Sequence, residues 1–316
     1  MRISEKIKRR FLSYLLWPAE FHLMISKRWQ YSYFKKLHKK LPLLYKSLAK
    51  YDADHFMTPH WRKFNERLET CLLPMPNFSF LRNRAILNTM FTTAGGNLMK
   101  SELKFLREQY SKKQLEMILD EDAVGRPVLM DHGYSTSHNT IHHAYHLAKY
   151  LDCTHKNLSQ INTIVEWGGG YGNTAKLFRR INNKPHTYIL IDTPLLICLQ
   201  WLYLATILGP ENIHIIANHN DKIRPNKINL LPVGLVGAVA PRADFFISTW
   251  GISESSPEAQ DFVKSKSWFG AQNLLIAYQE SNDTLPHAGR IKDLVLQSGA
   301  KIRGIEFLPK NYYAFL

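Results

Sequence analysis

The sequence predicts an α/β fold: a mostly parallel sheet covered by helices, preceded by an α-helical N-terminal region. From Thr163 onward, short continuous apolar segments alternate with helix-like segments, which is typical of β–α units whose strands are buried on both faces. Before Glu121, apolar residues recur at spacings of three and four, and no segment shows the period of two of a half-buried strand. We therefore divide the chain into a basic helical region, residues 1–121, and an α/β domain, residues 122–316.

In the helical region, the spacing is clearest from Leu41 to Leu48 and from Leu103 to Tyr110. Pro42 fits the first turn of the helix that follows it as well as a break between helices. The other expected breaks are positions rich in proline or glycine, namely Pro18, Pro59, the Pro74–Phe78 stretch and Gly95-Gly96. The segment that joins the two regions, residues 121–139, reads as a loop, and Ser137 or Asn139 is placed to cap a helix over Asn139–Asp152.

The α/β domain reads as strand and helix in turn. The clearest buried strand is TYILID, Thr187–Asp192, and Gly209-Pro210 ends the apolar helix that follows it. Only the four residues LPKN separate the last two strands, so we expect them to pair antiparallel. The other expected strands are Thr163–Glu166, Ile213–Ala217, Asp244–Thr249, Asn273–Gln279, Ile302–Phe307 and Tyr312–Leu316, and the expected helices are Gly172–Ile181, Leu195–Leu208, Pro257–Ser265 and Ile291–Ser298.

Positive charge is concentrated at the N-terminal end. The 316 residues include 41 Lys and Arg against 26 Asp and Glu, a formal charge of +15, and 13 of the basic but only 2 of the acidic residues lie in residues 1–50. A basic end on a near-neutral body favours a surface-docking element over a nucleic-acid-binding protein. Aromatic residues such as Trp17 and Trp29 interleave there with Lys and Arg. This pattern predicts either a solvated helix face or peripheral contact with an anionic membrane, with an acidic glycan-assembly partner or RNA as alternatives.

Cysteine usage indicates a reducing compartment. Cys71, Cys153 and Cys198 are far apart and form no CxxC pair, so neither a disulfide framework nor a thiolate metal site is expected. The apolar run FLSYLLW, Phe11–Trp17, is shorter than the roughly 20 residues that span a bilayer. We expect a cytoplasmic protein, peripheral on the inner membrane face if its N-terminal region docks there.

The segment that carries chemistry is EWGGGYGN, Glu166–Asn173, which ends a predicted strand and opens a predicted helix. Its alternating glycines allow a tight turn and a close backbone approach to a ligand. A GxGxxG dinucleotide loop would need glycine at the positions of Asn173 or Ala175; alanine is sometimes tolerated there, so this alternative stays open. The acid before the turn would repel a pyrophosphate, and it suits a ligand with a cationic group such as an amino-acid ammonium.

This loop resembles motif I of the class I S-adenosylmethionine-dependent methyltransferases. The resemblance implies a Rossmann-like sheet with an antiparallel last strand. It also implies that the carboxylate of Asp192, which ends the second strand, binds the ribose hydroxyls. Residues from Asn218 to Asp221, after the third expected strand, would lie near the adenine. The implied cofactor-binding residues are Glu166, Gly168, Gly170, Tyr171, Gly172, Asp192 and Asn218.

Three longer segments narrow the resemblance to one family. The chain is similar there to the sugar O-methyltransferase family of bacterial polysaccharide gene clusters. The segments are EWGGGYGNTAKLF, LIDTPLLICLQWLYL and the later DFFISTWGISESSPEA. Trp167, where a small aliphatic residue is usual, and Ser255, where methionine is expected, depart from the pattern. The resemblance covers about residues 122–316 and implies O-methylation of a sugar hydroxyl in polysaccharide or glycolipid biosynthesis. A methyltransferase acting on another small molecule or RNA, and a non-catalytic Rossmann-like binding module, are the alternatives.

Methylation of a hydroxyl requires a base, because a protonated hydroxyl is a weak nucleophile. The candidates are Glu254, after the fourth strand of the β–α units, and His142 and His143 on the helix before the glycine loop. Trp250 is equally suited to stacking on a ligand and to packing in the core.

The same helix carries candidate metal ligands. His138, His142 and His146 share one helix face at i, i+4 and i+8. Two of them with an acid could hold a divalent ion, but three successive turns reach too far for one tetrahedral metal and only Asp131 is near in sequence. We expect no resident metal, with a divalent cation as the alternative.

Overall fold

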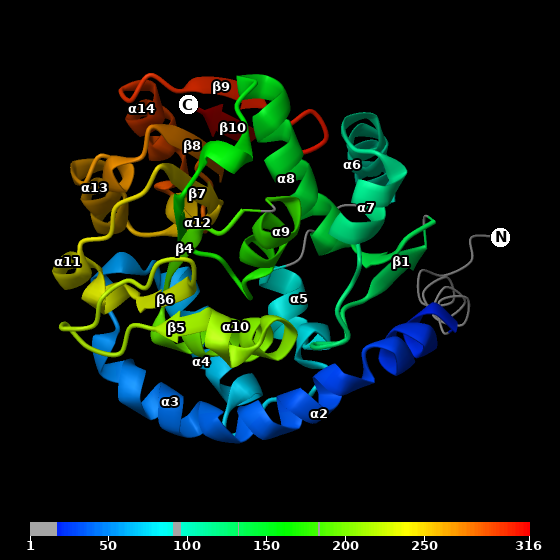
Figure 1. Cartoon of the computed structure of the whole chain (residues 1–316). Helices are drawn as coiled ribbons and strands as arrows, with labels where there is room; N and C mark the ends of the chain where they lie inside the picture. Colours follow the sequence, from blue (N-terminus) through cyan, green and yellow to red (C-terminus); the bar gives the residue numbers. More distant parts are fainter. Residues whose placement is uncertain (1–17, 91–95, 132, 183) are drawn as a thin grey trace.

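A computed structural model describes residues 18–90, 96–131, 133–182 and 184–316. At its centre is an eight-stranded sheet with the order β5-β6-β4-β3-β7-β8-β10-β9 (Figure 1). Neighbouring strands are parallel except at β10, which runs antiparallel to β8 and β9. This mostly parallel, Rossmann-like sheet with an antiparallel β10 confirms the fold class that the sequence predicts. The strands are β3 Thr163–Trp167, β4 Thr187–Asp192, β5 Ile213–Ile215, β6 Ile228–Pro232, β7 Phe245–Thr249, β8 Asn273–Gln279, β9 Lys301–Gly304 and β10 Asn311–Phe315.

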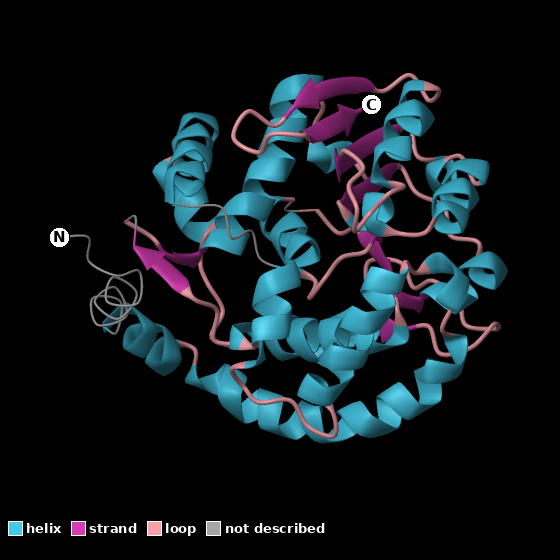
Figure 2. Ribbon diagram, turned by 180° about the vertical axis from the view of Figure 1, so that it is seen from behind, coloured by secondary structure: helices cyan, strands magenta, loops and turns pink. Residues whose placement is uncertain are grey.

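Helices cover both faces of this sheet, as the view from behind shows (Figure 2). Alternate residues of the strands enter two separate cores: Ile164 of β3 and Leu190 of β4 lie in one, and Val165 and Ile189 lie in the other. This explains why the parallel strands read as continuous apolar runs. The helices of the α/β domain are α8 His138–Thr154, α9 Asn173–Ile181, α10 Pro194–Leu208, α11 Val236–Val239, α12 Gly251–Glu254, α13 Pro257–Ser265 and α14 Ile291–Leu296.

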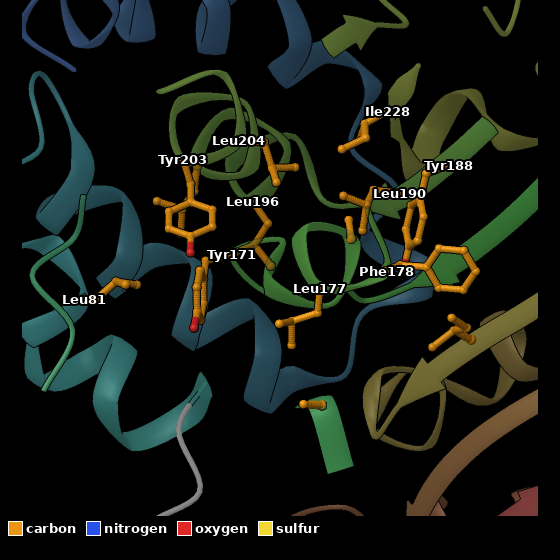
Figure 3. Close-up of a cluster of buried hydrophobic side chains, with 14 of the residues drawn as sticks. Leu81, Tyr171, Leu177, Phe178, Tyr188, Leu190, Leu196, Tyr203, Leu204 and Ile228 are labelled. Atoms are coloured by element: carbon orange, nitrogen blue, oxygen red, sulfur yellow. The ribbon is translucent and has the colours of Figure 1, made fainter. Parts of the chain in front are cut away.

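Helix α10 is buried on all sides. Its inner side packs on the sheet, and its outer side is covered by the N-terminal helices α2 Arg28–Leu37, α3 Leu41–Leu48 and α4 Pro59–Leu72. Figure 3 shows its Leu196, Tyr203 and Leu204 in the same cluster as Leu177 and Phe178 of α9. A helix that is apolar all round must be enclosed in this way, so the composition of α10 accounts for the docking of the N-terminal region against it.

The described part of residues 18–121 is helical, as the sequence predicts. Residues 18–26 are helical, and Pro42 and Pro59 lie in the first turns of their helices, where proline is tolerated. Thr58 caps α4 by accepting a hydrogen bond from Trp61 N. The remaining N-terminal helices are α5 Arg84–Met90, α6 Gly96–Gln109 and α7 Lys112–Ile118. Residues 1–17, which belong to the segment predicted to dock, lie outside the described residues.

Two elements differ from the expectation. The segment INLLP forms strand β6, inserted between β4 and β5, where the sequence predicted no strand. The loop expected over residues 121–139 contains a short hairpin of β1 Leu129–Asp131 and β2 Ser135–Ser137. Ser137 then caps α8 by accepting from Thr140 N, which selects between the two predicted caps. In the described part of the chain, no helix is both long enough and apolar enough to cross a membrane.

Candidate active site

A cavity of about 560 Å³ lies at the carboxyl ends of the central strands. This is the edge at which open α/β sheets bind ligands, and the volume is within the roughly 300–1,000 Å³ of small-molecule sites. Its walls come from the loop after β3, the end of β4, the loop after β7, two histidines of α8, and the N-terminal region. Of the residues predicted from the sequence to form the site, it is lined by Glu166, Gly168, Gly170, Tyr171, Asp192, His142, His143 and Glu254.

The glycine loop is held by a backbone-to-backbone contact. Gly168 has φ +75°, and a Cβ there would lie 2.8 Å from the Cα of Gly251. Gly251, at the start of α12, would place its own Cβ 2.4 Å from the carbonyl oxygen of Trp167. Both positions therefore need glycine. Sequence reasoning missed Gly251, because its partner is more than eighty positions earlier in the chain.

Gly170 and Gly172 differ in their surroundings. Of the residues that the structure describes, a Cβ on Gly170, at φ +57°, would meet only Met90 Sδ, at 3.9 Å, and Gly170 lines the cavity. Gly172 does not line the cavity; it precedes α9 at φ +93°, where a Cβ would lie 2.9 Å from Leu204. Gly172 therefore serves the packing of α9 against α10, and Gly170 leaves room for a ligand.

Asp192 ends β4 beside the glycine loop. Its Oδ1 accepts from Thr193 N at 2.9 Å and its Oδ2 accepts from Gln200 Nε2 at 2.8 Å, while Gln200 Nε2 also donates to Gly170 O at 3.0 Å. Gln200 thus ties the loop to the carboxylate. Burial raises the pKa of Asp192 to about 7.

Glu166 lies beneath the loop. Only 1% of it is exposed, and its Oε2 accepts from the Tyr188 hydroxyl at 2.8 Å. A Cβ on Gly169 would come within 3.0 Å of the same oxygen. Burial raises the pKa of Glu166 to about 7. Its carboxylate therefore supports the loop from below as well as forming part of the cavity wall.

The placement of Asn218 needs a correction. Asn218 follows the edge strand β5, donates from Nδ2 to Asp221 Oδ1 at 2.9 Å, and does not line the cavity. The strand next to β4 is β6, and the residue after it, Val233, does line the cavity. The error arose because β6 was not recognised in the sequence. Strand β5 was therefore taken as the neighbour of β4, and the residues that follow β5 were expected at the cavity.

The three candidate bases line the same cavity. His142 Nδ1 contacts Glu102 Oε1 of α6, and His143 Nδ1 lies 3.1 Å from Asn173 Nδ2. Glu254 Oε2 accepts from Trp61 Nε1 at 3.0 Å, and burial raises the pKa of Glu254 to about 7.

Trp250 forms part of this wall and is in the left-handed region, at φ +65°. Its ring stacks on His142 with centroids 5.7 Å apart, and its Nε1 donates to Asn311 at 2.7 Å. Trp250 therefore packs against His142 and lines the cavity, and its stacking on a ligand stays a prediction.

The N-terminal region supplies residues that the sequence did not point to. Phe56, Met57, Trp61, Thr89 and Met90 line the cavity. The segment before α4 is fastened to α12 and α13, since Ser256 N donates to Phe56 O and Ser256 Oγ donates to His55 O. No local motif marks these residues, because their position depends on packing between segments about 200 residues apart.

The two departures from the family pattern are partners in the structure. Trp167 Nε1 donates to Ser255 Oγ at 3.0 Å, and Ser255 Oγ donates in turn to Gly251 O at 2.8 Å. Trp167 is 4% exposed, so its indole N–H is paired where water has little access.

A buried ionic network lies behind the loop. Lys176 of α9 is fully buried, with Nζ 3.4 Å from both Glu121 Oε1 and Asp122 Oδ2, and it donates to the Tyr203 hydroxyl at 3.0 Å. Glu121 Oε2 accepts from Ser137 N at 2.8 Å, at the N-terminus of α8. The network thereby joins the helix after the glycine loop to the helix that carries the histidines.

These residues fit an adenosyl ligand with a cationic tail. The fit rests on a loop with an open face at Gly170, a carboxylate at the end of β4 beside it, and the unpaired buried oxygens Thr193 Oγ1 and Gln200 Oε1 near that carboxylate. Among the described residues, no group of three or more His, Cys, Asp or Glu is arranged to hold a metal ion.

The fold and the site together define a Rossmann-like α/β protein with a ligand cavity at the carboxyl edge of its sheet. No known protein family matches the chain, and no curated protein matches it. Solved structures resemble it at low identity. Fibrillarin from Aeropyrum pernix, with natively bound S-adenosyl-L-methionine, is 12% identical with a TM-score of 0.33, over 49% of this chain and 65% of that chain.

Two further structures extend over more of the chain. The mitomycin 7-O-methyltransferase MmcR is 12% identical with a TM-score of 0.41, over 82% of this chain and 68% of its own. An S-adenosylmethionine-dependent methyltransferase from Aquifex aeolicus is 14% identical with a TM-score of 0.37, over 68% of this chain and 96% of its own. The chain spans less than two-thirds of the length of several others that it matches, such as 56% of the pyocyanin biosynthetic protein PhzM.

Proposed function

We propose that the protein is an S-adenosylmethionine-dependent O-methyltransferase that acts on a sugar hydroxyl. The observation that carries the proposal is the glycine loop open at Gly170, tied through Gln200 to the buried carboxylate of Asp192. A carboxylate in this place can accept two hydrogen bonds from a ribose diol. When bound, S-adenosylmethionine supplies a methyl group on a sulfonium sulfur, which leaves as a neutral thioether with the electron pair of the broken bond.

The residues around the cavity have distinct tasks in this proposal. Gly168 and Gly170 hold the backbone close to the ligand, and Asp192 binds the ribose. Glu254, fixed by Trp61, binds a hydroxyl of the acceptor, because a carboxylate held by an indole N–H keeps free lone pairs for a second donor. Trp167 and Trp250 line the cavity, and aromatic residues there suit the apolar face of a sugar ring as well as adenine. The sugar class of acceptor comes from the sequence resemblance.

Titration calorimetry with S-adenosylmethionine, followed by transfer of its labelled methyl group to candidate acceptors, tests the proposal. Binding heat and methylation of a free or nucleotide-linked sugar would support it. Methylation of a phenolic compound or an RNA in place of every sugar would refute the acceptor class and leave the cofactor standing. An absence of heat would refute the cofactor and return the protein to the class of binding modules.

Asp192→Ala is expected to weaken S-adenosylmethionine binding by about 10- to 150-fold, because hydrogen bonds to a charged group contribute about 1.5–3 kcal/mol. With the pKa of Asp192 raised to about 7 by burial, the ionised form grows as the pH rises through that value, so wild-type affinity should rise with pH. The variant should have a weaker pH dependence, to which Glu166, whose pKa burial also raises to about 7, still contributes. Unchanged affinity in the variant would remove Asp192 from the binding site.

We further propose that the outer face of the N-terminal helices contacts an anionic membrane. The chain from Phe21 to Tyr51 contains no Asp or Glu, and its exposed residues include Lys35 and Lys36. Large apolar side chains stand among these cations: Trp29 is 49% exposed and Leu43 is 75% exposed. Aromatic and aliphatic groups mixed with lysine are typical of helices that lie in the membrane interface.

Vesicle flotation of the full chain should show stronger recovery with anionic than with neutral lipid. Lys35→Ala with Lys36→Ala should lower anionic binding about 30-fold, since each lysine near the surface contributes about 1 kcal/mol. The matched control is Lys112→Ala with Lys113→Ala, an exposed pair on α7, which should bind as the wild type does. Equal recovery in neutral and anionic vesicles would contradict the proposal.

A further inference from the structure

Two residues that are far apart in the sequence meet on the wall of the cavity, Trp61 of α4 and Glu254 of α12. We infer that Glu254 is the general base that takes the proton of the acceptor hydroxyl, and that Trp61 positions it by holding one carboxylate oxygen and leaving the other for the acceptor. The inference rests on the proposed function and selects among the three candidate bases. It also makes the N-terminal region a part of the catalytic site.

Glu254 lies close to the loop proposed to hold the methyl donor. The first residue of α12, Gly251, packs against that loop, since a Cβ on Gly168 would lie 2.8 Å from the Cα of Gly251. Glu254 ends the same short helix, about 4.5 Å further along its axis at a rise of about 1.5 Å per residue. The loop and Glu254 line one cavity. The carboxylate is therefore within about one helical turn of the place where the methyl group would be transferred.

The two carboxylate oxygens of Glu254 have different surroundings. Oε2 accepts from Trp61 Nε1 at 3.0 Å. Thr58, which caps α4, also donates from its hydroxyl to the backbone oxygen of Glu254 at 3.3 Å. Oε1 has no hydrogen-bond partner among the described residues, yet it is not one of their enclosed polar atoms, because Glu254 is only half-buried. One oxygen is thus fixed by the N-terminal region, and the other is open to a ligand in the cavity.

The two histidines are less suited to the role of base. His142 Nε2 is enclosed by protein, so it cannot reach a hydroxyl in the cavity, and His142 Nδ1 contacts Glu102. Burial lowers the pKa of His143 to about 3, which makes its ring a weak base. Burial raises the pKa of Glu254 to about 7, against the opposite effect of the hydrogen bond from Trp61. A base is most effective when its pKa is near the working pH, which favours Glu254.

No charged group shifts the pKa of Glu254, which depends on burial and on the hydrogen bond from Trp61. The other titratable side chains that line the cavity are His142, His143, Glu166, Tyr171 and Asp192. Those on the segment that carries Trp61 and on the elements packed against α12 are His55, His60, Arg62, Glu258, Asp261, Lys264, Tyr278 and Arg290. A pH dependence that responds to Trp61 can therefore be assigned to Glu254.

Proton transfer and bond formation occur at one oxygen of the acceptor. The acceptor O–H bond breaks and its proton passes to Glu254 Oε1, while an electron pair of the same oxygen forms the new bond to the methyl carbon. The electron pair of the broken carbon–sulfur bond stays on sulfur. Glu254 becomes a neutral acid, the form that burial favours, and Oε2 still accepts from Trp61. The proton passes to solvent after the product leaves.

The indole N–H signal of Trp61 reports on Glu254 without any acceptor. In ¹H–¹⁵N correlation spectra of the full chain, the signal that is lost in Trp61→Phe identifies it among the seven tryptophans. We expect this signal to shift with pH along a titration centred near 7, and to stay constant in Glu254→Gln, whose amide oxygen can still accept from the indole. Glu258→Gln, at an exposed position of α13, should leave the titration unchanged. A Trp61 signal that does not titrate, or that still titrates in Glu254→Gln, would overturn the inference.

Turnover tests the catalytic role. With the acceptor that the wild type methylates, Glu254→Gln should lower kcat by about 100- to 10,000-fold and keep the affinity for S-adenosylmethionine. At saturating cofactor, the wild-type kcat should rise with pH through about 7 as the carboxylate forms. Trp61→Phe keeps a ring to pack on Phe64 but removes a hydrogen bond that lowers the pKa of Glu254, so it should move this rise to higher pH.

The outcomes separate this inference from the proposed function. Full turnover of Glu254→Gln would refute the base, and an unshifted pH profile in Trp61→Phe would refute the positioning role; both results leave the proposed function intact. An absence of S-adenosylmethionine binding in the wild type would refute the proposed function, while the titration of the Trp61 signal could still be measured.

Discussion

Gly170→Val is expected to abolish binding of S-adenosylmethionine, lowering affinity by at least about 100-fold, or about 2.7 kcal/mol. Among the described residues, a Cβ at this position would meet only Met90 Sδ, at 3.9 Å, so its main cost to the fold is the backbone strain at φ +57°. The valine side chain would instead extend into the cavity that Gly170 lines and occupy space needed by the ligand. Calorimetry measures the loss directly, and a single cooperative melting transition, lowered about as much as in the control below, would show that the fold is retained.

The matched control is Gly299→Val. Gly299 follows α14 at φ +81°, with no atom within 4 Å of a Cβ, so valine carries the same backbone strain away from the cavity. It should lose stability and keep full affinity for S-adenosylmethionine. If the two variants lost affinity equally, strain would be the cause and the cavity would not be the binding site.

Lys176→Met should destabilise the protein by about 3–5 kcal/mol, the largest effect on stability that we expect from one substitution. The change removes a fully buried cation and leaves Glu121 and Asp122 in the interior, where Arg180, 2.9 Å from Asp122, is the cation that still pairs with them. Urea denaturation gives the free energy of unfolding. Arg290→Met, which breaks an ion pair whose side chains are 38% and 60% exposed, should cost less than about 1 kcal/mol.

The same network predicts a pH dependence. Burial alone would raise the pKa of Glu121, but the charge of Lys176 and hydrogen bonds from Ser137 and Thr140 lower it to about 2. A depressed carboxyl pKa stabilises the fold above the ordinary carboxyl range and loses that contribution as the pH falls toward about 2. The wild type should therefore lose stability on acidification more steeply than Lys176→Met. Parallel curves for the two proteins would show that the pairing with Lys176 does not set the acid sensitivity.

The sequence predicted local structure well because the signals are local. The bounds of Thr187–Asp192, Asn273–Gln279 and Pro257–Ser265 match β4, β8 and α13, whose apolar runs and flanking turn residues lie within a few positions. The glycine loop between β3 and α9 was found for the same reason. Strand β6 was missed because a short INLLP segment ending in proline resembles a loop, and that omission misplaced Asn218.

The rest of the site depends on contacts between distant segments. Trp61 meets Glu254 across 193 positions, and Glu102 meets His142 across 40. Neither Trp61 nor Glu102 belongs to a motif, and both lie in the N-terminal region, where no resemblance to a known family was found. The sequence gives one indication that the N-terminal region packs on the α/β domain: α10 is apolar on all sides, and such a helix must be enclosed by other elements. This pattern does not reveal which residues of the enclosing helices reach the cavity.

The hydrogen bond between Trp167 and Ser255 constrains how this protein can diverge. A methionine at position 255 would leave the buried indole N–H without an acceptor, and a small aliphatic residue at position 167 would leave a void beside Phe56 and Phe269, which now contact the indole ring. Neither substitution is neutral alone, so the two positions are expected to be inherited as a pair. Homologues with methionine at position 255 should lack tryptophan at position 167. The combination of Trp167 with Ser255 should mark a distinct lineage.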